Sequence, residues 1–466
     1  MAERILLLTG HLAEPRLKQM MNEFGREGLD WEIADIGVKV AALMTEEIIR
    51  RRLPRPVRAD RVILPGRVRA DLNRLAAEFG VPFERGPDEI VDIPTYFGRG
   101  GRRPDLTQHD TKIFAEIVDA PGRTIESILD RAGAMRTAGA DVIDLGCLPD
   151  TPFAHLEEAV QALKAEGFAV SIDSGDLRDL ERGAGAGADY LLSLDESNLD
   201  LAGEVAAIPV IVPARHGDLD SLVRACEKLE SKGLPYLADP VLDPIHFGFM
   251  DSLARYAAFR RLKPDAEMLM GTGNLTELTG ADTAGITAML MGIVSELRIR
   301  NVLVVQVSPH TRRTIEEHDA ARRAMFAARR DGNFPKGYGD ALLALHDLRP
   351  FASTSLEIAS AAAAVRDANF RIETAQDGIH VYNRDVHLVG TDAMSLFAGL
   401  GVERDGAHAF YLGAELAKAE IAWRLGKRYS QDEPLDWGCA ADLPEEDEKT
   451  RLKAPGHTLA LRRSAS

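Results

Sequence analysis

Short apolar segments alternate with longer segments of helical periodicity through the middle of the chain. Eight of the apolar segments have the length and composition of buried parallel strands. We predict strands over residues 112–118, 141–146, 169–173, 190–195, 210–213, 236–239, 268–271 and 302–307. Between them, residues 124–137, 153–165 and 219–232 carry apolar side chains three and four positions apart, which predicts helices. This alternation predicts an α/β fold with a (β/α)8 TIM barrel over residues 106–330, and an open doubly wound sheet is the alternative.

The segment before the barrel, residues 1–105, is predicted to be a small Rossmann-like α/β domain. Its strands are expected at 4–9, 31–36 and 61–65, with a helix over 17–24. The turn after the first strand has one glycine, Gly10, and lacks the G-x-G-x-x-G spacing of a dinucleotide site. A structural or docking role is therefore favoured over nucleotide binding.

The segment after the barrel, residues 331–466, follows a different pattern and predicts a C-terminal α+β domain. Residues 370–382 alternate apolar and polar side chains about an Asp377-Gly378 turn, as a β-hairpin does. Residues 411–426 have helical spacing and end at a glycine. A glycine-rich basic stretch at 98–104 is typical of a linker, and residues 445–466 form a polar tail.

The composition narrows the class of protein. The 466 residues include 45% hydrophobic and 28% charged residues, which is typical of a globular protein with a large core. A net charge of -17 argues against nucleic-acid partners and against adhesion to an anionic membrane. Three widely spaced cysteines without a C-x-x-C pair, and no apolar run long enough for a signal peptide or a membrane span, predict a cytoplasmic protein.

Polar side chains end most of the predicted barrel strands: Glu116, Asp144, Asp173, Asp195, Asp239 and Asn274. In a TIM barrel the carboxyl ends of the strands converge on one face, which is where active sites lie. A carboxylate buried there needs a partner, which is a ligand's N–H groups, a cation or a neighbouring Lys or Arg. For any single aspartate, capping of the next helix is the competing interpretation, and it is favoured for Asp173, which Ser-Gly-Asp follows.

Four of these segments resemble the motifs of dihydropteroate synthases, in the same order. Residues 139–152, GADVIDLGCLPDTP, resemble the GADIIDIGGESTRPG element, and residues 170–174, VSIDS, resemble ISIDT. Residues 190–195 take the place of IINDV, and residues 236–249, YLADPVLDPIHFGF, resemble LDPGIGFG. The arrangement of the whole chain resembles the dihydropteroate synthase-related proteins of tetrahydromethanopterin and one-carbon metabolism.

The resemblance implies a pterin-binding transferase. It implies that Asp144 and Asp239 bind the amino edge of the pterin, with Asn274 and either Ser193 or Asp195 completing the contacts. The implied reaction joins a hydroxymethyl-dihydropterin diphosphate to an arylamine, such as the ribofuranosylaminobenzene phosphate of the methanopterin pathway. Such a protein orients the ring and stabilises the departing diphosphate, so no nucleophilic side chain is assigned. The cationic candidates for the anion and the second substrate are Arg215, His216, His310, Arg312 and Arg313.

Departures from the synthase pattern leave two alternatives open. Gly273-Asn274-Leu275 stands where the synthases have Ser-Arg-Lys, so the synthase lysine is absent, and residues 148–152 lack the arginine of the second-strand loop. Asn274 and Glu116 instead resemble elements of the methyltetrahydrofolate:corrinoid methyltransferases. One alternative is therefore methyl transfer from a methylated pterin, and the other is a non-catalytic pterin-binding subunit.

Other kinds of site receive less support from the sequence. His216, His246 and His310 do not have metal-ligand spacing within one element, so no metal site is assigned, although Mg²⁺ bound by oxygens remains compatible. Cys147 has no neighbouring base in the sequence, so it is not interpreted as a nucleophile. Gly183, Gly185 and Gly187 follow a helix, where small residues allow close packing, so they are not interpreted as a phosphate-binding loop. A homodimer is a possible assembly.

Overall fold

The computed structural model describes residues 3–24, 29–38, 41, 44–98, 104–147 and 151–442. The chain divides into two compact units, of which the second spans Asp105–Leu343 together with Gly438–Ala441. The first unit combines the segment before the barrel with Ala344–Trp437. Most of the predicted linker, residues 99–103, and the whole polar tail lie outside the described residues, and the three domain limits stay predictions.

The second unit is a barrel of parallel strands, as predicted, and not an open sheet. The strands are β5 (Lys112–Ile117), β6 (Val142–Gly146), β7 (Ala169–Asp173), β8 (Tyr190–Leu194), β9 (Ile208–Ile211), β10 (Leu237–Ala238), β11 (Leu269–Gly271) and β12 (Asn301–Val304). They pair in the order β10-β9-β8-β7-β6-β5-β12-β11, and each described pairing is parallel. A parallel bridge between Ala238 and Met268 joins the two end strands and closes the ring.

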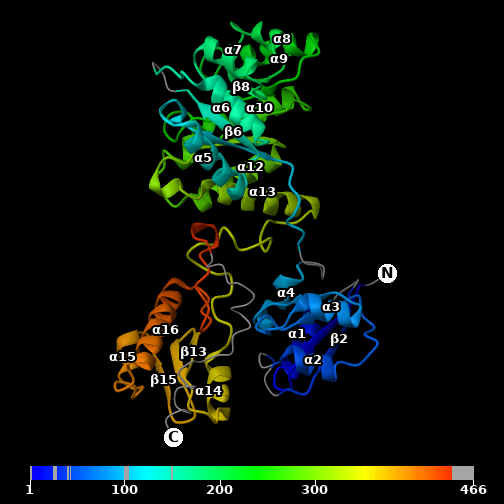
Figure 1. Ribbon diagram of the computed structural model, residues 1–466, viewed down its shortest axis with the longest axis vertical. Coiled ribbons are helices and arrows are strands. Elements are labelled where there is room, and N and C mark those ends of the chain that lie inside the picture. Colours follow the sequence, from blue (N-terminus) through cyan, green and yellow to red (C-terminus); the bar gives the residue numbers. More distant parts are fainter. Residues whose placement is uncertain are drawn as a thin grey trace. The chain divides into compact units, whose positions relative to one another are not determined.

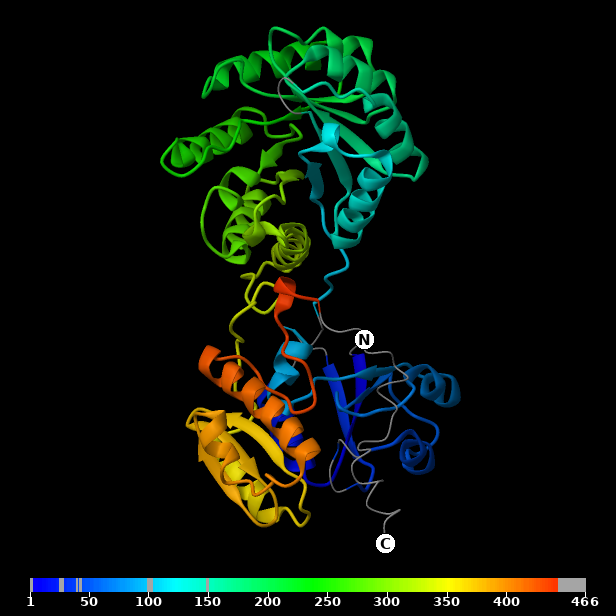
Figure 2. The same ribbon diagram turned by 60° about the vertical axis from the view of Figure 1, so that its left-hand side comes forward.

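Helices follow the strands and lie outside them (Figures 1 and 2). They are α5 (Ile125–Ala138), α6 (Leu156–Ala165), α7 (Leu177–Gly185), α8 (Leu201–Glu204), α9 (Leu219–Ser231), α10 (Phe249–Leu262), α11 (Gly273–Thr276), α12 (Thr283–Glu296) and α13 (Thr314–Arg330), with short 3-10 turns η3 (Ala120–Gly122), η4 (Pro309–Thr311) and η5 (Gly438–Ala440). Their limits follow local chemistry. The Thr124 side chain caps the start of α5, and Gly139, with φ 118°, ends it in a left-handed conformation.

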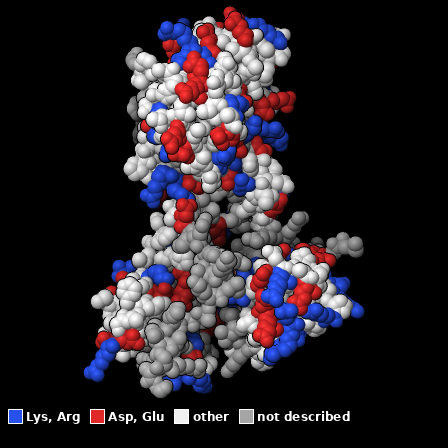
Figure 3. Space-filling model, viewed as in Figure 1, with Lys and Arg blue, Asp and Glu red and all other residues white. Residues whose placement is uncertain are grey.

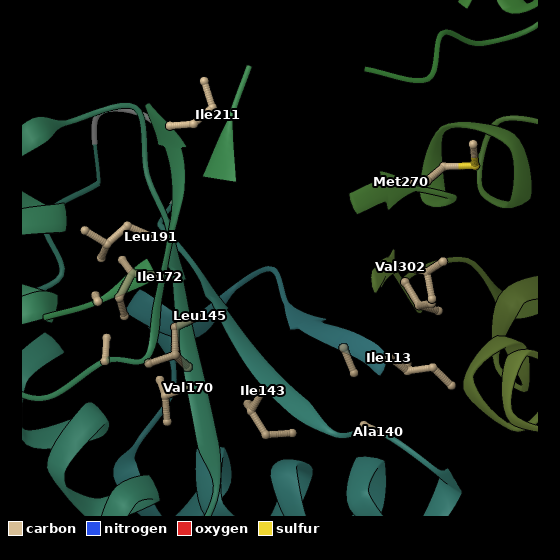
Figure 4. Packing of buried hydrophobic residues seen from close by; sticks show 14 of the residues in the cluster. Ile113, Ala140, Ile143, Leu145, Val170, Ile172, Leu191, Ile211, Met270 and Val302 are labelled. Carbon is tan, nitrogen blue, oxygen red and sulfur yellow. The ribbon is translucent and has the colours of Figure 1, made fainter. Parts of the chain in front are cut away.

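Side chains alternate between the two faces of the barrel strands, except at an irregularity in β8 between Leu192 and Leu194. Outward-facing residues such as Ile143, Val170 and Leu191 pack against the helices in the main hydrophobic core (Figure 4). The intervening residues fill the interior with a second apolar cluster: Phe114, Val142, Tyr190, Leu192, Val210, Leu237 and Leu269. This cluster fills the amino-terminal part of the barrel and leaves the polar residues toward the carboxyl ends of the strands.

The N-terminal part of the first unit contains a four-stranded parallel sheet with the order β2-β1-β3-β4. Its elements are β1 (Glu3–Thr9), α1 (Glu14–Phe24), β2 (Leu29–Asp35), α2 (Glu46–Arg52), β3 (Arg61–Leu64), α3 (Leu72–Phe79), β4 (Phe83–Arg85), η2 (Ile90–Asp92) and α4 (Ile93–Tyr96). The sequence pattern did not predict β4, because its three residues, FER, include only one apolar side chain.

The C-terminal part of the first unit contains α14 (Ser355–Ala364), β13 (Arg371–Ala375), β14 (Gly378–Tyr382), β15 (His387–Gly390), α15 (Ala393–Phe397) and α16 (Gly406–Leu425). The hairpin about Asp377 and Gly378 forms as predicted, and β15 adds an antiparallel third strand that the sequence pattern did not indicate. Gly426 ends α16 with φ 63°.

Charged side chains of both signs are interspersed on the face shown in Figure 3. Among the described residues, none of the helices combines the length and the apolar character that crossing a bilayer requires.

Candidate functional site

Four acidic side chains gather inside the barrel toward the carboxyl ends of its strands. Glu116, Asp144 and Ser171 occupy matching register positions on β5, β6 and β7. Asp173 lies two residues further along β7, opposite Gly146, and Asp239 follows β10. Carboxylate oxygens of Glu116, Asp144 and Asp173 all lie within 4.8 Å of one another. The alternation of side chains along adjacent parallel strands therefore brings acids distant in sequence into one group.

Gly146 makes room for this group. A Cβ atom at residue 146 would lie 2.6 Å from Glu116 Oε1 and 3.0 Å from the Cα of Val118. Such contacts are far inside van der Waals distance, so a larger residue there would displace the glutamate. Gly146 on β6 thus leaves room for the side chain of Glu116 on the neighbouring strand β5.

Asp144 is fully buried. One of its oxygens accepts a short hydrogen bond from the Ser171 hydroxyl, and the other, Oδ2, is buried without a hydrogen-bond partner among the described residues. A buried carboxylate oxygen without a donor is costly, since its hydration is lost and nothing replaces it. Asp144 therefore needs a proton, a donor or a cation that the described side chains do not supply.

The ionisation of the four acids reflects their burial and their mutual repulsion. Burial and the Asp173 charge raise the pKa of Glu116 to about 7, and burial followed by the charges of Asp173 and Glu116 raises the pKa of Asp144 well above its usual range. Burial and Asp239 raise the pKa of Asp173 to about 6. The charged neighbours that shift these three pKa values are other carboxyls. Clusters of strongly shifted acids at strand ends are typical of binding or catalytic sites.

Asp239 is held in a fixed orientation. Tyr256, on α10, donates its hydroxyl to Asp239 Oδ1 at 2.5 Å, and the Val241 amide donates to the same oxygen at 2.7 Å. Burial raises the pKa of Asp239 to about 6, although both hydrogen bonds and the Arg255 charge favour its ionised form. The carboxylate is thus positioned by protein donors on one oxygen.

The loop that follows Asp239 is strained and clamped. Val241 has φ 67°, which is unfavourable for a β-branched residue. Arg255 holds this loop by donating to the carbonyl oxygens of Pro240 (3.1 Å) and Val241 (2.7 Å) and to Asp243 Oδ2 (2.8 Å). Observed strain of this kind is found where a site must keep one geometry.

The predicted residues His216 and Asn274 both contact this loop. His216 Nε2 lies 2.8 Å from Asp243 Oδ1, and Asn274 donates its amide to the Leu242 carbonyl at 2.6 Å. Burial alone would raise the pKa of Asp243, but hydrogen bonds from Arg255 and His216 outweigh it and hold the pKa below the usual range. The structure therefore links Asn274 and His216 through the loop that carries Asp239.

Ser193 and Asp195 end β8. Ser193 lies at an irregularity in the pairing of β8 with β9. Asp195 accepts from the amide (2.7 Å) and hydroxyl (2.5 Å) of Ser197, so its described contacts form a local turn.

The cationic candidates have different surroundings. Arg215 and Arg312 are exposed. His310 is exposed too, and its Nε2 lies 3.1 Å from the Thr276 carbonyl oxygen. Arg313 donates to the Cys439 carbonyl at 2.9 Å and pairs with Glu316 at 3.1 Å, so its contacts serve the packing of η5 and α13.

The interpretation of Asp173 as a helix cap is wrong. Asp176 caps α7 by accepting from the Arg178 amide, whereas Asp173 is the last residue of β7 and belongs to the acidic group. Its period-two spacing from Ser171 could have indicated a shared interior face. Tyr256 carried no such signal, since it lies on a helix 17 residues after Asp239.

Two minor features agree with the sequence interpretation. Burial raises the pKa of the Cys147 thiol to about 12, which keeps it protonated and unreactive. A Cβ at Gly183 would lie 2.5 Å from the Ile172 side chain, so this glycine permits close packing of α7 on β7.

Comparisons with known proteins give a family match and several likenesses. A family model described as a family of unknown function, DUF6513, matches residues 3–88. An uncharacterized protein of Methanocaldococcus jannaschii, MJ0107, is 26% identical over 521 aligned positions, covering 92% of this chain and 98% of the relative.

Similar solved structures include dihydropteroate synthases. The Yersinia pestis enzyme with a pterine-sulfa conjugate is 17% identical, with a TM-score of 0.38, over 49% of this chain and 96% of that one. The Thermus thermophilus enzyme in complex with 6HMPPP is 21% identical, with a TM-score of 0.36, over the same shares. Because these identities and TM-scores are low, what the barrel binds has to be inferred from its own residues.

Proposed function

We propose that the barrel binds a pterin at the carboxyl ends of its strands and acts as a pterin-dependent transferase. The observation that carries the proposal is the group formed by the buried Asp144 and the half-buried Glu116, Asp173 and Asp239, whose pKa values are all raised. Acceptors concentrated in this way suit a ligand that presents several N–H donors on one edge. The 2-amino-4-oxo pyrimidine edge of a pterin is such a ligand, and a carboxylate accepting from it makes charge-assisted hydrogen bonds.

Within this proposal Asp239 is the main residue that binds the pterin, and Asp173 lies beside it. Asp239 Oδ1 is saturated by Tyr256 and Val241, which orients Oδ2 for a ligand N–H. Asp144 is fully buried and two residues deeper than the level of Asp173, so it supports the site from beneath. Asn274 helps to fix the loop beside Asp239, and its side chain is exposed.

The reaction that the sequence motifs favour is transfer of the pterin's methylene carbon to an arylamine. The amine nitrogen forms a bond to that carbon as the bond from the carbon to the diphosphate oxygen breaks, and the nitrogen loses its proton to solvent. The protein would orient the two reactants and neutralise the departing anion. Arg215, His216 and Arg312 are exposed side chains on loops after β9 and β12 that could meet it.

Methyl transfer from a methylated pterin is the second candidate, and one observation favours it. Gly273-Asn274-Leu275 replaces the Ser-Arg-Lys element, so the lysine that supports the diphosphate in a synthase is absent. Methyl transfer needs no diphosphate site.

A binding titration tests the pterin site, and a reaction assay separates the two candidates. Hydroxymethyl-dihydropterin and a methylated tetrahydropterin are titrated against the wild type, Asp239→Asn and Asp173→Asn by isothermal calorimetry. We expect each substitution to weaken binding at least tenfold, or about 1.4 kcal/mol. Asp176→Asn is the matched control, because Asp176 follows the same strand but caps α7. Unchanged affinity in both site variants would refute the pterin site. Diphosphate release with an arylamine identifies the synthase reaction, and methyl exchange identifies the alternative.

A further inference from the structure

We propose that Glu116, Asp144 and Asp173 bind a divalent metal cation inside the barrel. Two independent observations support this proposal. The three side chains offer carboxylate oxygens within 4.8 Å of one another. In addition, Asp144 is fully buried and its Oδ2 has no hydrogen-bond partner among the described residues.

The spacing fits a cation of moderate size. Oxygens bound to one Ca²⁺ at about 2.3–2.6 Å can lie at most about 5 Å apart, and those bound to Mg²⁺ at about 2.1 Å lie closer. The three carboxylate oxygens therefore meet the distance limit for one shared Ca²⁺ ion, and a small inward movement would admit the smaller Mn²⁺ or Mg²⁺. Ligands that are all carboxylate oxygens select these hard cations over Zn²⁺ or Cu²⁺.

The charge balance favours a cation over a further protein contact. Among the described residues, no lysine or arginine forms an ion pair with any of the three carboxyls. A divalent ion would neutralise two of the three negative charges and supply the missing partner of Asp144 Oδ2. Without it, Asp144 Oδ2 stays buried with no donor among the described residues.

The surrounding residues are arranged around this position. Gly146 leaves the space that Glu116 Oε1 occupies, and the Ser171 hydroxyl fixes Asp144 Oδ1. The apolar cluster that includes Phe114 and Tyr190 closes the barrel beneath the acids. The remaining coordination positions would face the carboxyl ends of the strands, where water or a ligand oxygen can enter.

Another described group, His11, Glu14 and Asp35, has metal-ligand spacing in the N-terminal part of the chain. His11 and Asp35 pair with each other, their Nδ1 and Oδ2 atoms lying 3.3 Å apart, and His11 is exposed. No buried orphan atom points to a ligand there among the described residues, so it carries no proposal. It does require a control in any metal titration.

The test uses the full-length chain, freed of metal with a chelator, and MnCl2 or CaCl2 alone. Calorimetry and the electron paramagnetic resonance of Mn²⁺ measure binding to the wild type and to His11→Ala, Asp144→Asn, Glu116→Gln and Asp176→Asn. We expect one ion per barrel in the wild type, His11→Ala and Asp176→Asn. Affinity should fall at least tenfold in Asp144→Asn and Glu116→Gln.

A thermal-unfolding comparison separates ligation from a purely structural role. In metal-free protein Asp144→Asn should raise the Tm, because it removes a buried ionisable group from beside two others. At saturating Mn²⁺ the order should reverse, because only the wild type is stabilised by the ion. Absence of Mn²⁺ binding by the wild type at millimolar concentration, or wild-type affinity in Asp144→Asn, would overturn the proposal. No pterin is present in these experiments, so their outcome is independent of the proposed function.

Discussion

Gly146 and Glu116, on neighbouring strands β6 and β5, are fitted to each other: a Cβ at residue 146 would lie 2.6 Å from Glu116 Oε1. The glycine therefore determines where the glutamate carboxylate can lie. This relationship connects the fold of the barrel directly to the geometry of its acidic group.

Gly146→Ala should displace Glu116 and weaken Mn²⁺ binding at least tenfold. It should also lower the free energy of unfolding by about 1–3 kcal/mol, because the new methyl group meets backbone atoms of Ile117 and Val118 as well. Gly133→Ala on α5 is the matched control, since no described atom outside that helix lies within 4 Å of its Cβ position, and it should stabilise the helix slightly. Calorimetry and chemical denaturation measure both effects. Wild-type Mn²⁺ affinity in Gly146→Ala would show that Glu116 is not a ligand.

Tyr256→Phe should raise the pKa of Asp239 above about 6. The hydroxyl that donates to Asp239 Oδ1 favours the ionised carboxylate and so counters the rise in pKa that burial causes. Its removal takes this counteracting hydrogen bond away. Titration of the carboxyl carbon by NMR measures the change. In the control, Tyr236→Phe, the lost partner is the more exposed Glu230, so the pKa of Asp239 should not move. An Asp239 pKa that is equal in all three proteins would contradict this account of the loop.

Acidification should destabilise the barrel through His318. This side chain is fully buried on α13, its Nδ1 lies 2.6 Å from the Thr314 carbonyl oxygen, and Nε2 has no partner among the described residues. Burial lowers its pKa from about 6.5 to about 4. Between these two pH values, His318 is therefore protonated in the unfolded chain but neutral in the folded chain. The neutral, buried His318 therefore leaves the free energy of unfolding unaffected above pH 6.5. As the pH falls toward 4, protonation of the unfolded chain lowers the free energy of unfolding by about 3 kcal/mol.

The acids of the barrel change stability in the opposite direction as the pH falls, because their folded pKa values are raised. The informative measurement is thus the difference between the wild type and His318→Leu in urea denaturation at pH 7 and pH 4.5. The wild type should lose more stability over this interval than the variant. An identical pH dependence in the two proteins would remove His318 from the explanation.

Arg322→Met should destabilise the barrel by about 3–5 kcal/mol. Arg322 is buried and donates to the carbonyl oxygens of Thr111 (2.7 Å) and Gly139 (2.9 Å), and it pairs with Asp141 and with Asp319. Its removal takes a donor from both carbonyl oxygens and an ion-pair partner from both carboxylates, although Asp319 keeps its ion pair with Arg323. Arg330→Met, near the end of the same helix, is exposed and should hardly change stability. Chemical denaturation measures both, and a small loss in Arg322→Met would contradict the role of this network.

The order of strands and helices could be predicted because the spacing of apolar residues within each segment indicates its type. The limits of β7 agree with the predicted range 169–173, and those of β5 and β8 agree to within one residue. The start of α5 at Thr124 and its end at Gly139 follow from capping chemistry that the sequence displays. The short strands β4 and β15 were not predicted, because their sequences, FER and HLVG, show neither a period nor a continuous apolar run.

The composition of the site could be predicted only in part. Glu116, Asp144 and Asp239 were identified because each lies in the carboxyl-terminal part of a predicted strand or directly after it, and the barrel brings these parts of its strands together. Asp173 was misinterpreted, because a strand-end acid and a helix cap look alike when a helix follows closely. Arg313 was predicted to meet an anion, and this stays a prediction; two of its described contacts are with Glu316 and Cys439.

The sequence by itself determined that the chain contains a parallel barrel with acids at its strand ends, since alternation along a strand and periodicity along a helix are local properties. Only the tertiary structure decided which acids lie within 4.8 Å of one another, which oxygen of Asp144 lacks a donor, and which distant residues hold Asp239. Register, barrel closure and the packing of α10 on the strands bring those residues together, and they depend on contacts between segments far apart along the chain.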